Sequence, residues 1–511
     1  MKRNIIKTIN IALLLVGAIT GSSCSDLLDQ KPQGEWNVND QKGSFEGQVF
    51  AIYGLMRDFS VTSGTPALAI HNFRSEDAEK GSTKGDGEVN AKMYDDFEYS
   101  ATNGLIASYW TGNYNIIHKS NTLLSDIKTE EEKGELSVDN KRSKAEAMFF
   151  RSFAYFNLVR AFGEVPLITF KLDQAEDANV PKSKVEDIYA LIDSDLDFAA
   201  ENLPTQWGQI YIGRLTSGAA NALHARAHMT RNDWANTHKY ASAVINSGMY
   251  NLNTPFDVIF REKGENSSES VFEIQCTATA SQPDDDKIGS KFALVQGVRG
   301  AGQFDLGWGW HTPTDILASA FEKNDPRKDE TLLYFAKTAA EAATMKPNKP
   351  YGEVPIAQTD VVNNYYNKKA YTDPALRAKY TRYGAWFNIR IIRYSDVLLM
   401  AAEAANELGN VSQASGLIEQ VRARARGNNP NVLPLINTTD QSLMREHIRH
   451  ERRIELAMEW DRFYDLVRWG IAKEVLHAAG KVNYQDKHAY LPIPQSQIDN
   501  SEGILVQNPN Y

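Results

Sequence analysis

Apolar residues recur at steps of three and four over residues 143–161, which is the first strong helical pattern of the chain. Such steps place side chains on one face of a helix, so the segment predicts a helix with a wide aromatic side to bury. Gly163 and Pro166 follow and predict its end. A second amphipathic run covers residues 185–202. The residues that recur in the first run are Ala145, Met148, Phe149, Phe153, Phe156 and Val159.

Two pairs of helices rich in small residues come next in the pattern. Residues 216–247 predict two helices joined at Arg231–Asp233, and residues 394–425 predict two helices joined at Gly409 and Asn410. A helix, a tight polar turn and a second helix with small residues at the crossing are typical of tetratricopeptide pairs. The copies are not in tandem, so they predict repeat units separated by a long insertion. We therefore expect a mainly α fold with tetratricopeptide-like helix pairs forming a scaffold at about 104–247 and 388–478.

The insertion, at about residues 250–386, has a different composition. It contains many glycines, several prolines and a dense group of Trp and Tyr residues, with little sustained helical periodicity. Binding residues tend to lie on irregular segments held by a rigid scaffold. We expect this loop-rich, irregular insertion to bind ligand, together with the similar stretch at residues 73–99.

Residues 446–469 predict one further helix, with apolar residues on most faces. Its charged residues are expected to be paired and partly buried. They are Glu455, Glu459, Arg462, Asp465 and Arg468. His447, His450 and Glu451 give the order H-x-x-H-E, which differs from the helical zinc motifs H-E-x-x-H and H-x-x-E-H. The sequence therefore predicts no metal site on this helix.

The charge balance disfavours nucleic acid as a partner, and the hydropathy predicts no membrane-spanning helix. The 511-residue chain has 65 acidic and 55 basic side chains, for a formal net charge of -10. Non-specific affinity for nucleic acid comes from Lys and Arg on phosphates, so this balance disfavours nucleic acid as a partner. No stretch supplies the roughly 20 apolar residues of a membrane-spanning helix. A membrane attachment would need another device.

The N-terminus predicts such a device. Lys2, Arg3 and Lys7 precede a short apolar core at residues 11–19, and small residues then precede Cys24. We interpret residues 1–23 as a lipoprotein signal peptide, Cys24 as the lipidation site, residues 24–40 as a tether and residues 41–511 as a single body. Lipidation of Cys24 would leave Cys276 without a disulfide partner. An ordinary signal peptide with an incidental cysteine is the alternative.

Short motifs in a fixed order cover the chain from Cys24 to the C-terminus. They are Cys24-Ser-Asp-Leu-Leu-Asp29; Arg74-Ser-Glu-Asp77; Ala145-Glu-Ala with Arg151 and Tyr155, leading to Gly163-Glu-Val-Pro-Leu167; Gly307-Trp-Gly-Trp310 with Pro313 and Asp325-Pro-Arg327; Arg393-Tyr-Ser-Asp-Val-Leu-Leu399 with Ala402-Glu-Ala404; Glu451-Arg-Arg with Glu455-Leu and Glu459; and Leu491-Pro-Ile-Pro494 followed by Gln507-Asn-Pro-Asn-Tyr511. In this order they resemble the SusD/RagB family of outer-membrane nutrient-binding lipoproteins.

The resemblance implies a mainly helical fold in which tetratricopeptide-like pairs cradle an irregular ligand-binding region. It also implies a lipid-anchored protein of the outer membrane, facing the cell surface, that captures an oligosaccharide or polysaccharide. Such a protein would deliver the glycan to a partner TonB-dependent, SusC-like transporter. On this basis we expect no enzymatic activity and no cofactor.

Glycan chemistry points to two tryptophans in the insertion. A sugar ring has an apolar C–H face that stacks on Trp or Tyr, while its hydroxyls need polar partners. Trp308 and Trp310 fit this need, because alternate residues of an extended segment share a face. We expect them to form one platform for ligand, with Gly307 and Gly309 permitting close approach. The alternative is that one or both fill the insertion's own core.

The stretch at residues 73–99 adds four candidate ligand-binding residues. Arg74 and Asp77 precede a glycine-rich loop, and Tyr94 and Phe97 follow it. Charged groups beside aromatic rings on a loop suit the binding of sugar hydroxyls. A solvated charged loop without a binding role is the alternative.

Two other functions and the presence of a structural calcium ion remain open. A lipid-anchored glycoside hydrolase would need two facing carboxylates, which Asp and Glu residues in this number do not exclude. A repeat-type scaffold would bind proteins through its concave helical face. Asp284–Asp286 resemble the start of a calcium loop, although Ile288 and Val295 stand where oxygen ligands are needed, so a structural calcium is an alternative to no cofactor.

Overall fold

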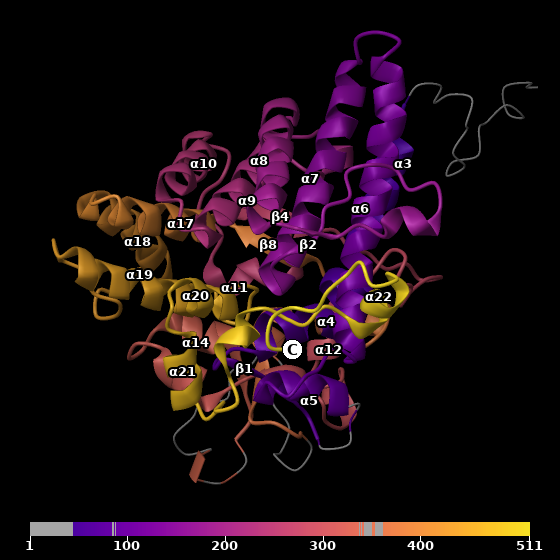
Figure 1. Cartoon of the computed structure of the whole chain (residues 1–511). Helices are drawn as coiled ribbons and strands as arrows, with labels where there is room; N and C mark the ends of the chain where they lie inside the picture. The colour runs from indigo at the N-terminus through magenta and orange to yellow at the C-terminus, as the bar shows by residue number, and fades with distance from the viewer. Residues whose placement is uncertain are drawn as a thin grey trace, which may run out of the picture. The chain divides into compact units, whose positions relative to one another are not determined.

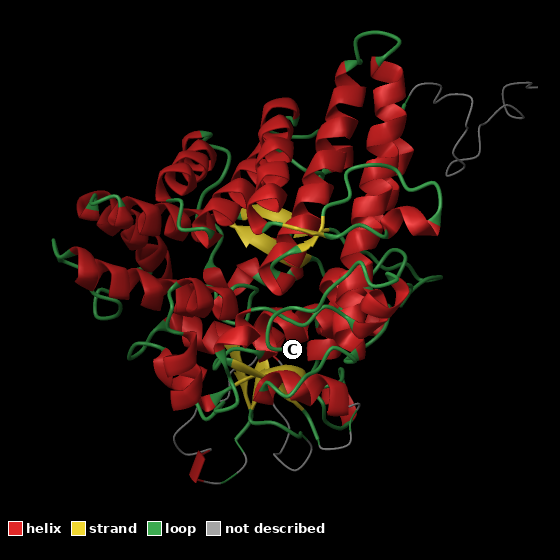
Figure 2. Cartoon of the chain, in the orientation of Figure 1, coloured by secondary structure: helices red, strands yellow, loops and turns green. Residues whose placement is uncertain are grey.

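Helices dominate the structure, with strands only in short pairs (Figures 1 and 2). The computed structural model describes residues 44–83, 86, 88–336, 338, 340–341, 350–352 and 361–511. Phe45–Tyr511 form one compact unit. The expected signal peptide at 1–23, Cys24 and the tether at 24–40 lie outside the described residues. None of the helices in the described ranges has the length and apolar character needed to cross a membrane.

The scaffold helices are α6 (Gly104–Glu131), α7 (Val138–Phe162), α8 (Val185–Asn202), α9 (Ser217–Thr230), α10 (Trp234–Asn246), α17 (Tyr394–Glu407), α18 (Val411–Arg426) and α19 (Gln441–Glu455). Each packs on its neighbour in this order, and α17 also packs on α19 (Figure 1). Helix α10 thus lies against α17 although the insertion separates them in sequence. The prediction of a mainly α fold with tetratricopeptide-like helix pairs around an insertion is confirmed.

Small residues explain the close packing of the two predicted pairs. Ala219, Ala220 and Ala222 on α9 are buried, as are Ala401 and Ala402 on α17. Side chains of this size let helix backbones approach without leaving cavities. Polar residues then start the second helix of each pair, because the carboxylate of Asp233 caps α10 and the side chain of Asn410 caps α18.

Shorter helices build the irregular part of the unit. The α-helical ones are α3 (Glu46–Met56), α4 (Thr65–Leu68), α5 (Glu88–Asp96), α11 (Phe256–Ile259), α12 (Phe292–Gln296), α13 (Asp315–Ala320), α14 (Pro326–Thr331), α16 (Pro374–Lys379), α20 (Arg462–Arg468), α21 (Ala472–Ala478) and α22 (Gln495–Asn500). Two π-helical turns, η1 (Phe59–Ser63) and η2 (Ala69–Phe73), flank α4. The 3₁₀ turns are η3 (Ala175–Ala178), η4 (Gln209–Tyr211), η5 (Glu262–Gly264), η6 (Gly302–Phe304), η7 (Pro350–Gly352), η9 (Lys368–Ala370) and η10 (Asp486–Ala489).

Four antiparallel strand pairs hold the loops together in the described part of the chain. They are β1 (Ala78–Gly81) with β5 (Trp310–Pro313), β2 (Val165–Pro166) with β3 (Lys182–Ser183), β4 (Ser270–Ile274) with β8 (Ile389–Arg393), and β6 (Leu332–Tyr334) with β7 (Tyr365–Asn367). Strand β4 lies near the start of the insertion and β8 leads directly into α17. Their pairing therefore closes the base of the insertion against the scaffold.

The single helix expected at residues 446–469 is wrong, because the chain turns between α19 and α20. Met458 has a φ of 63°, in the left-handed region that a non-glycine residue rarely adopts. The turn brings Glu459 and Asp461 to buried arginines: Arg393 donates to Glu459, and Arg160 donates to Asp461 at 2.8 Å. Electrostatic pairing at the turn thus replaces the helical hydrogen bonds that the periodicity predicted.

Buried ion pairs join the insertion to the scaffold. Arg393, at the end of β8, donates to Glu269 at 2.5 Å, to Glu455 at 3.0 Å and to Glu459 at 2.8 Å. Arg424 of α18 donates to Glu269 and Glu455, both at 2.6 Å. Despite the opposing effect of burial, the charges of the surrounding arginines hold the pKa of Glu455 well below its usual range. We call these five residues the buried charge network.

The predicted pairing of the charged residues in this region is confirmed. Besides Glu455 and Glu459, Arg462 pairs with Glu76, Asp465 with Arg452, and Arg468 with Glu403. The sequence indicated that these charges would be paired. It did not identify partners that come from distant segments.

Replacing Arg393 by Met should lower the free energy of unfolding by about 3–5 kcal/mol, because it leaves buried carboxylates without their counter-charge. Lys133→Met is the matched control, since Lys133 and Glu130 form an exposed pair at 2.6 Å whose loss should change stability little. Urea unfolding followed by circular dichroism measures both. Equal stability of the two variants would show that the network contributes nothing.

Candidate functional site

A cleft of about 520 Å³ lies where the 73–99 stretch meets the insertion. Polar side chains from four segments line most of it, and we call it the polar cleft. Its lining residues are Glu76, Glu79, Lys92, Asp95, Asp96, Pro313, Thr314, Asp315, Ile316, Asn363, Asn364, Tyr365, Ala479, Gly480 and Lys481. Its volume is within the range of small-ligand sites.

Strand pairing positions the floor of the polar cleft. Glu79 of β1 stands opposite Thr312 of β5, which fixes the insertion against the N-terminal stretch. Thr314, just beyond β5, donates its hydroxyl to the carbonyl of Glu76 at 2.7 Å and caps helix α13 through its side chain. The cap places Asp315 and Ile316 in the first turn of α13, where both are exposed at the rim of the cleft.

Helix α5 contributes a lysine and two aspartates to the lining of the cleft. The ammonium of Lys92 lies 3.2 Å from Asp95 and 3.6 Å from Asp96. Asp95 also accepts the backbone N–H of Lys80 at 3.0 Å. Burial raises the pKa of Asp95 to about 6, against the opposing charges of Lys481 and Lys92. This carboxyl group therefore changes its charge in mildly acidic solution. Asp96, next to it in sequence, is partly exposed.

Tyr365 provides an aromatic ring at the cleft, next to two amides. It begins β7, is partly exposed and lies 5.2 Å from the ring of Tyr334, centroid to centroid. Burial and the nearby charge of Asp315 raise the pKa of Tyr365 to about 12, so its hydroxyl remains protonated and can donate. Asn363 and Asn364 precede it and line the same cleft. A flat ring beside amides and carboxylates is the combination that a sugar needs.

The two tryptophans of the insertion do not form the expected platform. Their rings are 5.5 Å apart but inclined at 60°, so one flat ligand face cannot stack on both. Trp310 is 7% exposed, whereas Trp308 is partly exposed and packs near Phe59. A β-carbon at Gly307 would lie 2.1 Å from the carbonyl oxygen of Leu294, so this glycine permits close approach of the protein's own backbone.

Trp310 is instead tied to the loop after β1. Its Nε1 donates to Asp86 at 3.0 Å, and Ser82 donates to the same carboxylate at 2.7 Å. Arg299 also pairs with Asp86. Although partial burial opposes ionisation, these hydrogen bonds lower the pKa of Asp86. Asn363 accepts the N–H of Ser82 at 3.0 Å, so this cluster supports one end of the polar cleft.

Burial excludes Arg74 and Asp77 from the ligand contact expected of them. Arg74 has no exposed surface, donates to the carbonyl of Ile70 at 2.8 Å and stacks over Phe463 at 4.0 Å. Asp77 is 1% exposed and accepts two hydrogen bonds from Nε of Arg453 at 3.0 and 3.1 Å. The C-terminal segment covers both residues. This cover comes from almost 400 residues away in sequence, so local pattern did not predict it.

Tyr94 and Phe97 are likewise core residues. Tyr94 is fully buried and donates to Asn103 at 3.2 Å. Phe97 is 3% exposed and meets the ring of Tyr484 edge-on at 5.1 Å. Of the six residues expected to bind ligand, Trp308 therefore keeps the most surface. Sequence reasoning missed Tyr365 as a site residue, although the run Asn363-Asn364-Tyr365-Tyr366 placed amides beside aromatic rings in the insertion.

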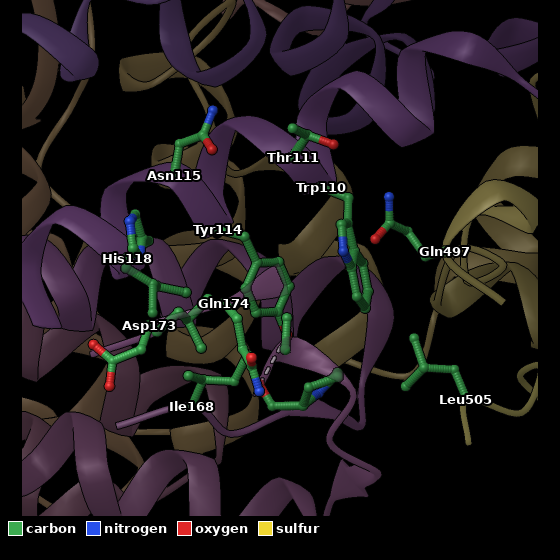
Figure 3. Close-up of a pocket in the computed structure, with 14 residues that line it drawn as sticks. Trp110, Thr111, Tyr114, Asn115, His118, Ile168, Asp173, Gln174, Gln497 and Leu505 are labelled. Atoms are coloured by element: carbon green, nitrogen blue, oxygen red, sulfur yellow. Dashed lines mark hydrogen bonds between the residues drawn. The ribbon is translucent and has the colours of Figure 1, made fainter. Parts of the chain in front are cut away.

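A second cavity, of about 490 Å³, lies beside α6, the loop after β2 and the C-terminal segment (Figure 3). Trp110 and Tyr114 stand together in its wall with ring centroids 4.9 Å apart, and Tyr114 donates to the carbonyl of Pro166 at 2.8 Å. Ile168 and Leu505 add apolar surface. Because its polar groups are fewer than those of the polar cleft, this cavity suits a glycan less well.

Two of the three consecutive aspartates, Asp284 and Asp286, pair with a lysine of the protein itself. Lys291 lies 3.2 Å from Asp284 and 2.9 Å from Asp286, and Asp285 accepts the N–H of Lys287 at 2.8 Å. These contacts form a local turn without a second group of ligands. Within the described ranges, this segment is not among the side chains that converge closely enough to share an ion.

Comparison with known proteins assigns the family. A family model described as "SusD family" matches residues 268–511, and one described as "Starch-binding associating with outer membrane" matches residues 26–229. The chain belongs to the SusD/RagB family. SusD-like protein P2 of Formosa agariphila is 27% identical, with both chains covered in full. The resemblance inferred from the short motifs is thus confirmed.

Solved structures of SusD-like proteins share the fold. A laminarin-binding SusD-like protein is 26% identical, with 91% of this chain and 98% of that chain covered and a TM-score of 0.75. Surface glycan-binding protein A from Bacteroides thetaiotaomicron, solved in complex with laminarihexaose, is 23% identical, with 91% and 99% covered and a TM-score of 0.73. The SusD-like fold therefore extends over nearly the whole described unit.

Trp310→Ala should destabilise this SusD-like protein by about 3–5 kcal/mol, because it removes a buried ring and leaves Asp86 without one of its donors. Trp308→Ala should cost less, since its ring is partly exposed. Chemical denaturation of both variants makes the comparison. Wild-type stability of Trp310→Ala would restore the interpretation of this ring as a free ligand platform.

Proposed function

We propose that this protein binds an oligosaccharide or polysaccharide in the polar cleft, at the surface of the outer membrane. The observation that carries the proposal is the convergence of the Tyr365 ring with the amides of Asn363 and Asn364 and the carboxylates of Asp96 and Asp315. A sugar ring would stack on Tyr365 while its hydroxyls exchange hydrogen bonds with these groups. The family assignment and the glycan-binding relatives support the same function.

The charge of the cleft favours a neutral glycan. Besides Glu76, which is paired with Arg462, four acidic residues line the cleft, whereas only two basic residues do. The acidic ones are Glu79, Asp95, Asp96 and Asp315, and the basic ones are Lys92 and Lys481. Lys481 is already engaged, because its ammonium donates to the carbonyl of Phe73 at 2.6 Å. A polyanionic glycan would face a surplus of carboxylates, which disfavours it. Affinity would then rest on stacking and hydroxyl contacts, with little dependence on salt.

Binding without cleavage fits these residues better than hydrolysis. A glycosidase needs one carboxylic acid and one carboxylate facing each other across the bond, roughly 5–9.5 Å apart. In the polar cleft, Asp95 is bonded to a backbone N–H and Asp96 lies beside Lys92. Incubation of the protein with a glycan panel and analysis of the products tests this point. Release of shorter sugars would favour the lipid-anchored hydrolase instead.

Capture at the membrane would serve transport. We propose that Cys24 carries the lipid anchor and that the protein delivers glycan to a SusC-like, TonB-dependent transporter. One of the two matching family models supports this location. It matches residues 26–229 and is described as "Starch-binding associating with outer membrane". The scaffold helices would also offer a surface for such a partner, so protein binding through the repeats complements glycan binding.

Tyr365→Ala should weaken glycan binding at least about tenfold, because the loss of a ring contact costs roughly 1.5 kcal/mol and 1.4 kcal/mol is a factor of ten. Tyr365→Phe should keep most of the affinity, since the ring remains. Tyr383→Ala is the matched control, because Tyr383 is partly exposed in the insertion and does not line the cleft. Calorimetry with a panel that includes laminarihexaose measures all three variants.

Two results would contradict the proposal, one from these variants and one from a salt series on the wild type. Unchanged affinity of a folded Tyr365→Ala variant would exclude the polar cleft as the site. A steep loss of wild-type affinity between low and high salt would show that an acidic glycan is bound and that charge carries the affinity.

Cys24→Ala should move the protein from the membrane fraction to the soluble fraction of cells, because it removes the proposed acylation site. The wild-type protein should also co-purify with a large outer-membrane barrel protein after mild detergent extraction. Fractionation followed by immunoblotting measures the first effect. Equal recovery of wild type and variant in membranes would reject lipidation at Cys24.

A further inference from the structure

Ionisable side chains face one another where α8 packs on α9. None of them lines the polar cleft. Asp193 and Asp197 are four residues apart on α8, and His224 and His228 are four residues apart on α9. Residues at this spacing share one face of a helix. His224 has no exposed surface and His228 is 5% exposed. Two buried imidazoles thus meet the carboxylates of a neighbouring helix.

The two distances from Asp193 are close to those between ligand atoms of one metal ion. Oδ1 of Asp193 lies 3.2 Å from Nε2 of His224 and 3.6 Å from Nε2 of His228. One ligand atom from each residue lies within 4.8 Å of the others. Zinc bonds of about 2.0–2.2 Å in a tetrahedron separate ligand atoms by roughly 3.3 Å. A small shift of the side chains would complete the geometry.

The outer nitrogens of both rings also face carboxylates. Nδ1 of His228 lies 3.1 Å from Asp233, and Nδ1 of His224 lies 3.6 Å from Asp197. Asp197 is itself held by the hydroxyl of Tyr240 at 2.7 Å. Histidines that bind metals usually direct their second nitrogen to a carboxylate or carbonyl, which orients the ring. Both imidazoles therefore have an inner nitrogen toward Asp193 and an outer one toward an acidic residue.

Stacking fixes the orientation of the rings. The rings of His224 and His228 are 4.7 Å apart and inclined at 26°, and Tyr240 stacks on His224 at 3.7 Å. Side chains held in this way need little reorganisation to bind an ion, which favours affinity. Two histidines four residues apart on one helix are also the arrangement by which helical zinc motifs bind their metal.

Arg231 is the present counter-ion of the cluster. Its guanidinium donates to Asp193 at 2.7 and 2.9 Å, and its Nη2 lies 2.8 Å from Nδ1 of His228. The Arg231 side chain is 25% exposed, and that of Asp193 is 29% exposed, so the arginine has room to turn toward solvent. A metal ion and this guanidinium would compete for the same carboxylate.

We propose that Asp193, His224 and His228 bind one transition-metal ion of the zinc class, which displaces Arg231 from Asp193. Two imidazoles and one carboxylate suit zinc, cobalt or nickel, whereas calcium and magnesium need oxygen ligands. Water would fill the fourth position. The ion links α8 to α9 and thereby stabilises the scaffold, independently of glycan binding.

Calorimetric titration of the EDTA-stripped, purified full chain with zinc chloride tests the site. One ion should bind per chain, and cobalt should give the visible absorption of a tetrahedral site. His224→Gln and His228→Gln should each weaken zinc binding at least about tenfold. His238→Gln on α10 is the matched control and should bind as wild type does, because this histidine bonds Gln413 outside the cluster. Arg231→Met should bind zinc more tightly, since the competing cation is gone.

Three results would overturn the proposal. The first is the absence of one-to-one zinc binding in both the wild type and Arg231→Met, which would show that Arg231 serves only as a structural ion-pair partner. The second is unchanged zinc binding in a folded variant that lacks both histidines. The third is weaker binding in Arg231→Met, a comparison that remains decisive if the histidine variants fail to fold.

Discussion

The buried charge network is the constraint on which the arrangement of this molecule depends. Taking an ion out of water costs several kcal/mol, and the cost is offset only when each charge has well-placed partners. Arg393 meets this condition by bonding Glu269, Glu455 and Glu459. These residues come from the base of the insertion and from the end of the scaffold. These contacts favour the observed docking of the insertion, because separating its base from the scaffold would leave buried charges unpaired.

Docking of the insertion in turn creates the polar cleft. The pairing of β1 with β5 brings Glu79 beside Thr312. Asn363, just before β7, lies near the end of β1 because it accepts the backbone N–H of Ser82. The four residues of the 73–99 stretch that were expected to bind ligand are buried and serve this assembly instead. Arg74 stacks on Phe463, and Asp77 pairs with Arg453. Side chains on the rim, which are less constrained, remain for ligand.

The site shows where sequence reasoning was sufficient and where it was not. A binding region in the insertion and the 73–99 stretch could be proposed from composition, because sugars need flat rings beside polar groups. The individual residues could not, because a buried Trp310 and a partly exposed Tyr365 look alike in sequence. His224 and His228 stand at helical spacing, but Asp193 lies on another helix, so only the fold brings the three together.

Short-range patterns and motifs were enough to predict the main scaffold helices and the family. Periodicity sets which residues a helix must bury, and local capping sets where it ends, so α8, α9, α10, α17 and α18 follow from short-range rules. Short-range pattern did not predict which charged and aromatic residues face solvent. Exposure depends on what covers a residue, and Arg74 is covered by a segment that lies more than 400 residues away in sequence. The tertiary structure also decided the turn at Met458, where pairing with distant arginines outweighs helical periodicity.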